Sequence, residues 1–312
     1  MKSIDIIHYT AKAVRKNLIQ DNQKIDVLIK EATEVVYVAS GSTALGIASA
    51  TKDFSEKTTH VIQNINEFEK IIAKKNQKIL VFGVSMSGLS TEVGEILRLA
   101  SSKALNTIYV TKALPIENVT TNIILDFEEI PIRFLPFAIC LLVHHYHRSG
   151  FDEQIIDKIQ FPLKSQFDEL LFFLEFTHKS ELTPIFVTSD YPFWGYLLST
   201  QYIEFLKKAA FHLSFPEWTH NYLWVLEKRH KNCVSFIHMK PQVDLKDDRF
   251  KNVVAHIKSL QIHQLIIGNL PIFCDKYQSS SQLLQVLVLY WELSRKIGID
   301  PNIERSFNFN LQ

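Results

Sequence analysis

Short apolar runs rich in β-branched residues alternate with stretches of helical periodicity in the first half of the chain. The runs lie at residues 35–40, 60–65, 78–84, 107–111 and 122–127. Continuous apolar strands that alternate with helices are typical of parallel strands covered by helices on both faces. The pattern therefore predicts an α/β fold with a doubly wound, mainly parallel sheet.

The second half repeats this rhythm less regularly. Apolar runs alternate with helical stretches at 183–189, 232–239 and 263–268, and a final helix is expected from about 280 to 298. A long apolar helix at 133–148, followed by polar and amphipathic segments, comes between the two halves. Because a domain usually takes about 100–200 residues, we expect two domains, at residues 1–155 and 156–312.

Composition and charge narrow the class of protein. The 312 residues are 46% hydrophobic and 21% charged, as in ordinary globular proteins. The 34 Lys and Arg residues balance the 33 Asp and Glu residues, which gives a formal net charge of +1. The protein therefore has no overall positive electrostatic field that would attract nucleic acid or an anionic membrane. No apolar stretch is long enough for a signal peptide or a membrane span. We expect a cytoplasmic protein with neither kind of partner.

The cysteines and a histidine cluster give no signal for a metal site. Cys140, Cys233 and Cys274 are widely spaced in apolar runs, so we expect buried thiols and no disulfide. The histidines at 144, 145 and 147 are expected at the solvated end of the apolar helix, where positive charge is favourable. No metal is expected at either group.

The most informative stretch follows the apolar run at 78–84, where the loop SMSGLS leads into a helix. In a parallel sheet, ligands bind beyond the carboxyl ends of the strands, and helix N-termini there present free N–H groups. Ser85, Ser87 and Ser90 would add three hydroxyl groups around Gly88, which lets an anion approach the backbone. The loop therefore indicates a phosphate site. Alternatively, Ser90 is only a helix N-cap and the other serines form turns.

The spacing Ser-x-Ser-Gly-x-Ser/Thr resembles the phosphosugar loop of sugar isomerase (SIS) domains. A second loop, Ser40-Gly41-Ser42-Thr43, lies where that family has a Gly-Gly-Ser segment entering a helix. The resemblance implies two SIS domains, each a doubly wound α-β-α sandwich. It also implies that Ser42, Thr43 and Gly41 contact the sugar phosphate, although an ordinary capped helix start would leave the same pattern.

The segment FPEWTHNYLW at 215–224 resembles the Pro-Glu-x-x-His-Asn segment of the bifunctional phosphoglucose/phosphomannose isomerases. The resemblance implies that Glu204 is the proton-shuttling base, that His220 opens the sugar ring and that Arg133 stabilises the enediolate. Each residue also has a structural alternative. Glu204 could pair with Lys208, Arg133 could pair with Glu128 or Glu129, and His220 could be a partly buried structural histidine.

The function expected from this resemblance is aldose–ketose isomerisation. Glucose 6-phosphate or mannose 6-phosphate would be converted to fructose 6-phosphate through a cis-enediolate, with no metal or organic cofactor. The family also implies a homodimer in which the histidine reaches the partner's active site.

Three departures from the family pattern leave other functions open. No lysine follows the turn Gly298-Ile299-Asp300-Pro301, and Lys296 precedes it. Leu89 replaces the family's loop asparagine, and Tyr222 replaces an acid. A non-catalytic phosphosugar sensor, or an isomerase of another phosphosugar such as an amino sugar phosphate, therefore remains an alternative.

Overall fold

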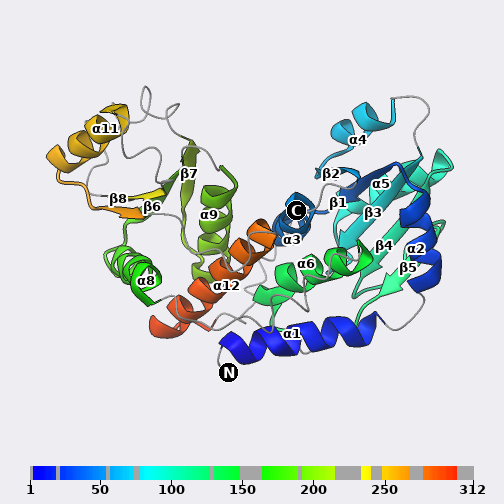
Figure 1. Ribbon diagram of the computed structural model, residues 1–312, viewed down its shortest axis with the longest axis horizontal. Helices are drawn as coiled ribbons and strands as arrows, with labels where there is room; N and C mark the ends of the chain where they lie inside the picture. The colour runs from blue at the N-terminus through cyan, green and yellow to red at the C-terminus, as the bar shows by residue number, and fades with distance from the viewer. Residues whose placement is uncertain are drawn as a thin grey trace, which may run out of the picture. The chain divides into compact units, whose positions relative to one another are not determined.

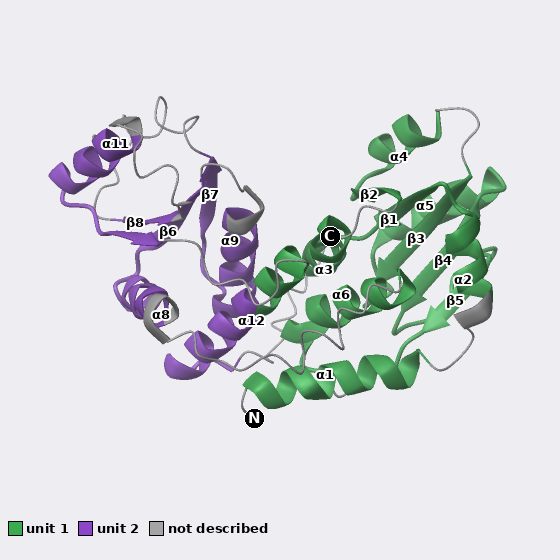
Figure 2. Ribbon diagram, viewed as in Figure 1, with its two compact units in different colours: residues 1–160, 272–284 green, residues 161–271, 285–312 purple. Residues whose placement is uncertain are grey.

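The structure is a computed structural model that describes residues 3–18, 22–53, 57–73, 78–126, 130–147, 164–188, 192–214, 233–239, 248–267 and 277–300. The chain forms two compact units, coloured separately in Figure 2. Unit 1 comprises Met1–Gln160 and Ile272–Leu284, and unit 2 comprises Phe161–Pro271 and Gln285–Gln312. Residues 272–284, which the expected division assigns to the second half, thus belong to unit 1. Whether either half folds as an independent domain stays a prediction.

Unit 1 contains a five-stranded parallel sheet (Figure 1). Its strands are β1 (Glu34–Val38), β2 (Thr58–Ile62), β3 (Ile79–Ser85), β4 (Asn106–Thr111) and β5 (Thr121–Ile124). The strand order is β2-β1-β3-β4-β5, and every pair is parallel. All five strands fall on the apolar runs, which confirms the predicted parallel sheet.

Helices cover both faces of this sheet. They are α1 (Ser3–Asn17), α2 (Asn22–Glu31), α3 (Gly41–Lys52), α4 (Ile65–Ile72), α5 (Thr91–Ser102) and α6 (Leu135–Tyr146), with the short 3-10 helix η1 (Ile132–Phe134) before α6. On one face, Val36 and Val81 pack with Phe68 of α4 and Ile96 of α5. On the other face, Phe82 contacts Tyr146 of α6. The alternation follows from the two-residue period of a strand.

Helices α3 and α6 pack closely, and Gly46 makes this possible. A Cβ atom at Gly46 would collide with the backbone carbonyl of Pro136 in the first turn of α6. Near the other end, Asp53, just after α3, lies 3.9 Å from the ring of His144. The contacts 46 with 136 and 53 with 144 show that the two helices run in the same direction.

Unit 2 contains a four-stranded parallel sheet of β6 (Thr183–Thr188), β7 (Phe211–Ser214), β8 (Val234–Met239) and β9 (Gln264–Ile267). The order is β7-β6-β8-β9, again with every pair parallel. Its helices are α8 (Lys164–Lys179), α9 (Pro192–Leu206), α11 (Asp248–Ser259) and, shared with unit 1, α12 (Gln278–Lys296). The short edge strand β7 has no counterpart among the apolar runs.

The two faces of the second sheet pack against different helices. Ile185 and Phe236 pack against Val253 and Ile257 of α11. On the opposite face, Phe186 contacts Tyr202 of α9, whose ring lies edge-on to Tyr290 of α12. Unit 2 therefore has the same α-β-α layering as unit 1.

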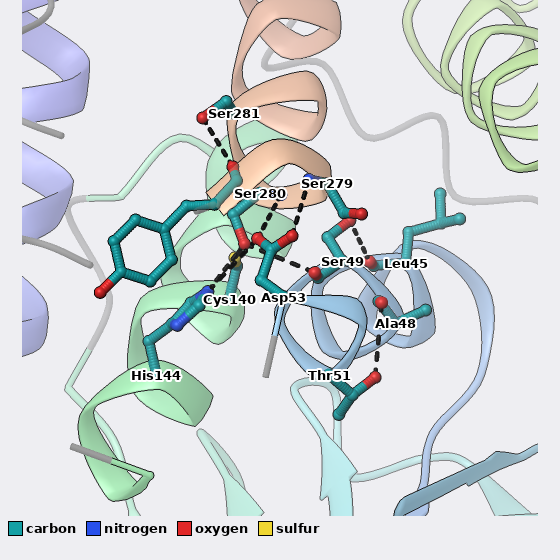
Figure 3. A network of polar contacts seen from close by, with 11 residues as sticks. Leu45, Ala48, Ser49, Thr51, Asp53, Cys140, His144, Ser279, Ser280 and Ser281 are labelled. Atoms are coloured by element: carbon teal, nitrogen blue, oxygen red, sulfur yellow. Dashed lines mark hydrogen bonds and ion pairs between the residues drawn. The ribbon is translucent and has the colours of Figure 1, made fainter. Parts of the chain in front are cut away.

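A buried polar network joins α3, α6 and the start of α12 (Figure 3). The Asp53 carboxylate accepts hydrogen bonds from the backbone N–H groups of Ser279 and Ser280, both at 2.8 Å. The Ser280 hydroxyl lies 2.7 Å from His144 Nε2 and accepts a hydrogen bond from Cys140 Sγ at 3.3 Å. The network supplies partners for polar groups that lie in an otherwise apolar interior.

Two expectations about single side chains were wrong. His144 is not at a solvated helix end, because only 1% of it is exposed, and burial lowers the pKa of its ring to about 3. Cys140 is buried as expected, but Cys233 is exposed. Cys274 lies outside the described residues. In the described ranges, no helix combines the length and the apolar character needed to cross a membrane.

Candidate functional site

The two candidate phosphate loops lie at the point where the strand order of the first sheet reverses. Strand β1 pairs with β3, and Val38 is level with Gly83 near their carboxyl ends. The chain leaves β1 towards α3 and leaves β3 towards α5, so both loops open at the same edge of the sheet. In open α/β sheets, ligands bind at such a switch point. The sheet therefore brings the two serine-rich loops to adjacent positions.

Gly88 shapes the loop between β3 and α5. Its φ angle is +69°, a conformation that side chains disfavour, and a Cβ atom there would collide with the side chain of Ala113. Its N–H donates to the Ser85 carbonyl at 3.2 Å, which closes the turn. The loop exposes Ser87, whose hydroxyl oxygen accepts a hydrogen bond from Leu89 N at 3.2 Å. Ser85, at the end of β3, is buried at the base of the loop.

Ser90 is the N-cap of α5, as one of the alternatives proposed. Its oxygen accepts a hydrogen bond from Val93 N at 3.4 Å, and its hydroxyl donates to Glu92 Oε2 at 3.2 Å. The Thr91 hydroxyl donates to the same oxygen at 3.3 Å. The backbone N–H of Glu92, followed by the Ser90 hydroxyl, lowers the pKa of the Glu92 carboxyl. The phosphosugar motif does not single out Glu92. An acidic residue in the first turn is, however, a known sequence signal of a helix N-terminus.

The loop between β1 and α3 is also built around a glycine with a positive φ angle. Gly41 has a φ of +57° and begins α3, while Ser40 is the N-cap and makes no side-chain capping bond. Ser42 and Thr43 are half-buried in the first turn of the helix. The first four N–H groups of a helix have no partner within it, so this turn can donate hydrogen bonds to an anion.

Arg133 lies in η1 and is 7% exposed. Because α3 and α6 run in the same direction with residue 46 beside 136, Arg133 comes level with the first turn of α3. Its expected alternative partners, Glu128 and Glu129, lie outside the described residues. Arg133 is therefore a buried residue whose backbone lies towards the same end of α3 as Ser42 and Thr43.

The other two candidate catalytic residues belong to the second unit. Glu204 is half-buried on α9. Lys208, its expected structural partner, instead donates to the carbonyl oxygen of His178 at 2.9 Å. His220 and the whole segment 215–224 lie outside the described residues, and so does Tyr222.

The lysine near the end of α12 is engaged within unit 2. Lys296 Nζ lies 2.5 Å from Glu175 Oε2 of α8, and Lys179 Nζ lies 2.6 Å from the other oxygen of the same carboxylate. Hydrogen bonds from these two lysines lower the pKa of Glu175. Among the described residues, no group of three or more His, Cys, Asp or Glu side chains is placed to hold a metal ion.

Comparisons with known proteins identify the fold. The chain matches no protein-family profile and no curated protein sequence. It is similar to the crystal structure of a candidate phosphosugar isomerase from Clostridium difficile 630, with a TM-score of 0.64 and 13% identity over 99% of this chain and 97% of the other. It is also similar to glucosamine-6-phosphate deaminase from Thermotoga maritima, with a TM-score of 0.58 and 15% identity over 97% of each chain.

A third similar structure is the C-terminal domain of glucosamine-fructose-6-phosphate aminotransferase from Francisella tularensis. The TM-score is 0.56, with 12% identity over 96% of each chain. At this level of identity the likeness concerns the fold. It confirms the two-part parallel α/β architecture expected from the sequence, which this chain shares with these phosphosugar-related structures.

Proposed function

We propose that the chain binds a sugar phosphate at the loops that follow β1 and β3. The observation that carries the proposal is that the N-termini of α3 and α5 both lie at the switch point of one parallel sheet. Each of these helix starts has serine and threonine hydroxyls next to it. The names of the similar structures support a phosphosugar as the ligand. In the proposed site, the phosphate accepts hydrogen bonds from Ser85, Ser87, Ser90, Ser42 and Thr43. Gly41 and Gly88 let the ligand approach the backbone.

The proposed reaction is isomerisation of a hexose 6-phosphate between its aldose and ketose forms. His220 would exchange a proton with the ring oxygen and open the ring. Glu204 would then remove the proton from C2 of the aldose and return it to C1, through a cis-enediolate. The buried guanidinium group of Arg133 would stabilise the negative oxygen of that intermediate, because a charge-assisted hydrogen bond is strongest where water is excluded.

A non-catalytic phosphosugar sensor is the second candidate function. The observation in its favour is the ion pair of Lys296 with Glu175, which engages the lysine nearest to the family's ring-opening position. A sensor would keep the phosphate loops and bind the ligand without turnover. The names of two similar structures also make glucosamine 6-phosphate a substrate to test.

A panel assay of the purified protein separates these functions. Glucose 6-phosphate, mannose 6-phosphate, fructose 6-phosphate and glucosamine 6-phosphate are supplied in turn, turnover is followed by coupled enzymes, and binding is followed by calorimetry. Conversion of the three hexose 6-phosphates into one another supports the isomerase. Binding without conversion supports the sensor, and conversion of glucosamine 6-phosphate alone supports an amino sugar enzyme. Absence of binding to all four would overturn the proposal.

We also propose that the active protein is a homodimer, because a histidine supplied by a partner subunit would make the site incomplete in a monomer. Sedimentation across a range of protein concentrations tests this point. A monomer with full activity would contradict it.

A further inference from the structure

The loop between β3 and α5 leads into a helix turn that carries an anion of its own. Glu92 lies in the first turn of α5, and its Oε2 accepts hydrogen bonds from the hydroxyls of Ser90 and Thr91, at 3.2 and 3.3 Å. A carboxylate at this end of a helix is favoured by the helix dipole and by the free N–H groups there. Glu92 therefore uses the same kind of electrostatic stabilisation that a bound phosphate would use.

Counting donors shows that Ser90 cannot serve both anions at once. A serine hydroxyl has one proton, and the Ser90 oxygen already accepts a hydrogen bond from Val93 N. Its proton is directed to Glu92, so a phosphate group can receive it only if Glu92 releases it. Ser87 differs, because in the described contacts its oxygen only accepts a hydrogen bond, from Leu89 N. Its proton is therefore available to a ligand.

The negative charge of Glu92 also disfavours a bound phosphate. Glu92 is exposed, and it follows Ser90 by two residues and Thr91 by one, so its negative charge lies next to both hydroxyls. A sugar phosphate is mostly a dianion at neutral pH, since its second pKa is near 6. Like charges held at the same helix terminus repel each other, and this repulsion weakens with added salt.

We propose that Glu92 is an internal competitor of the phosphate group: its carboxylate orders Ser90 and Thr91 before the ligand binds and limits the affinity for the sugar phosphate. This inference rests on the proposed binding of phosphate at the loop after β3. In this role Glu92 is a residue that sets affinity and eases release of the product. It is displaced from the two hydroxyls when the ligand binds.

The test compares fructose 6-phosphate binding by the wild-type protein, Glu92→Gln, Glu92→Ala and Glu95→Gln, using calorimetry at low and high salt. Glu92→Gln removes the charge and keeps the shape, while Glu92→Ala also frees both hydroxyls. Glu95 is exposed on the same helix, so its variant measures the effect of one negative charge that does not contact the loop. We expect both Glu92 variants to bind about three- to tenfold more tightly at low salt, with a smaller gain at high salt. Glu95→Gln should stay within about twofold of the wild type.

A purely structural role for Glu92 predicts a different result. Loss of an acidic residue from the first turn lowers helix stability slightly, so a structural role lowers the melting temperature and leaves or weakens binding. Glu92 variants that remain folded and bind with unchanged or lower affinity would overturn the inference while leaving the phosphate site intact. If neither the wild-type protein nor the Glu92 variants bind, the proposed phosphate site is itself wrong, and the inference falls with it.

Discussion

Asp53 accepts a hydrogen bond from the backbone N–H of Ser279 at 2.8 Å, although 226 residues separate the two in the chain. Its second oxygen accepts a hydrogen bond from Ser280 N at the same distance. One carboxylate thus caps the first turn of α12 and, because Asp53 directly follows α3, ties that turn to the end of α3 (Figure 3). The first N–H groups of a helix need such partners when the helix begins in the interior.

We therefore expect Asp53→Asn to destabilise the protein. An asparagine offers one acceptor oxygen and turns an NH₂ group towards the second N–H, so one buried donor loses its partner. The expected loss is about 1–3 kcal/mol in the free energy of unfolding, measured by urea denaturation. Asp126→Asn is the matched control. The Asp126 side chain is 67% exposed, and its ion pair with Lys16 is long, at 4.0 Å, so the loss of this charge should change stability little. Equal stabilities of the two variants would contradict the capping role.

Stability should fall as the pH is lowered below about 6.5. Burial lowers the pKa of His144 from its usual 6.5 to about 3, so the unfolded chain binds a proton in this window that the folded chain does not. The free energy of unfolding then decreases by about 1.4 kcal/mol per pH unit for each such group. His147 and His238, whose pKa values burial lowers to about 4, act in the same direction. Burial raises the pKa of Asp53, so at low pH the folded chain binds a proton at this carboxyl more readily than the unfolded chain does. This proton uptake offsets part of the loss of stability caused by the histidines.

His144→Gln should reduce this slope between pH 4 and 6, because glutamine does not titrate. The slope is measured by urea denaturation at several pH values. His8→Gln, at an exposed position of α1, is the control and should leave the slope close to that of the wild type. If both variants keep the full slope, His144 is not a major source of the pH dependence.

Two glycine-to-alanine changes in helices should have opposite effects. At Gly46, the new Cβ atom collides with the backbone carbonyl of Pro136, and overpacking of this kind costs about 1–3 kcal/mol. At Gly94 in α5, the nearest atom is an Arg98 nitrogen at 3.6 Å, so alanine fits and should stabilise the helix by up to about 1 kcal/mol. Thermal unfolding measures both, and a stabilising Gly46→Ala would show that α3 and α6 do not pack as described.

Ser87→Ala should weaken binding of the sugar phosphate and leave binding of the unphosphorylated sugar unchanged. Loss of a hydrogen bond to a charged group corresponds to about a tenfold loss of affinity or more. Ser102→Ala is the control, because its exposed hydroxyl donates to the Leu99 carbonyl at the far end of α5. Calorimetry with fructose 6-phosphate and fructose distinguishes the two ligands. An equal loss for both sugars would exclude Ser87 from the phosphate site.

Glu204→Gln is the sharpest test of the enzymatic proposal. A base that moves the proton between C1 and C2 acts in the transition state, so turnover should fall by about 10²–10⁴-fold while the dissociation constant changes little. Glu169→Gln, on an exposed position of α8, controls for loss of a negative charge in unit 2. A Glu204→Gln variant that isomerises at the wild-type rate would rule out this residue as the base.

Strands in the cores of the two sheets could be predicted from the sequence, whereas the edge strand β7 could not. Strands such as β1 and β3 are buried on both faces, so their apolar runs are continuous, as at Val35–Val38. In β7, Phe211 is exposed and the other three residues are half-buried, which leaves only four residues with no apolar run. Its place is decided by pairing with β6, a long-range contact that the local sequence does not carry.

For the candidate site, local sequence determined the loops, and tertiary structure decided what surrounds them. Ser87, Gly88 and Ser90 could be found because a turn and a helix start depend on neighbouring residues. Three features depend on how helices far apart in the chain pack together. They are the position of Arg133 relative to α3, the burial of His144 and the capping of α12 by Asp53. Burial and long-range hydrogen bonds are properties of the folded chain as a whole, so no window of sequence could reveal them.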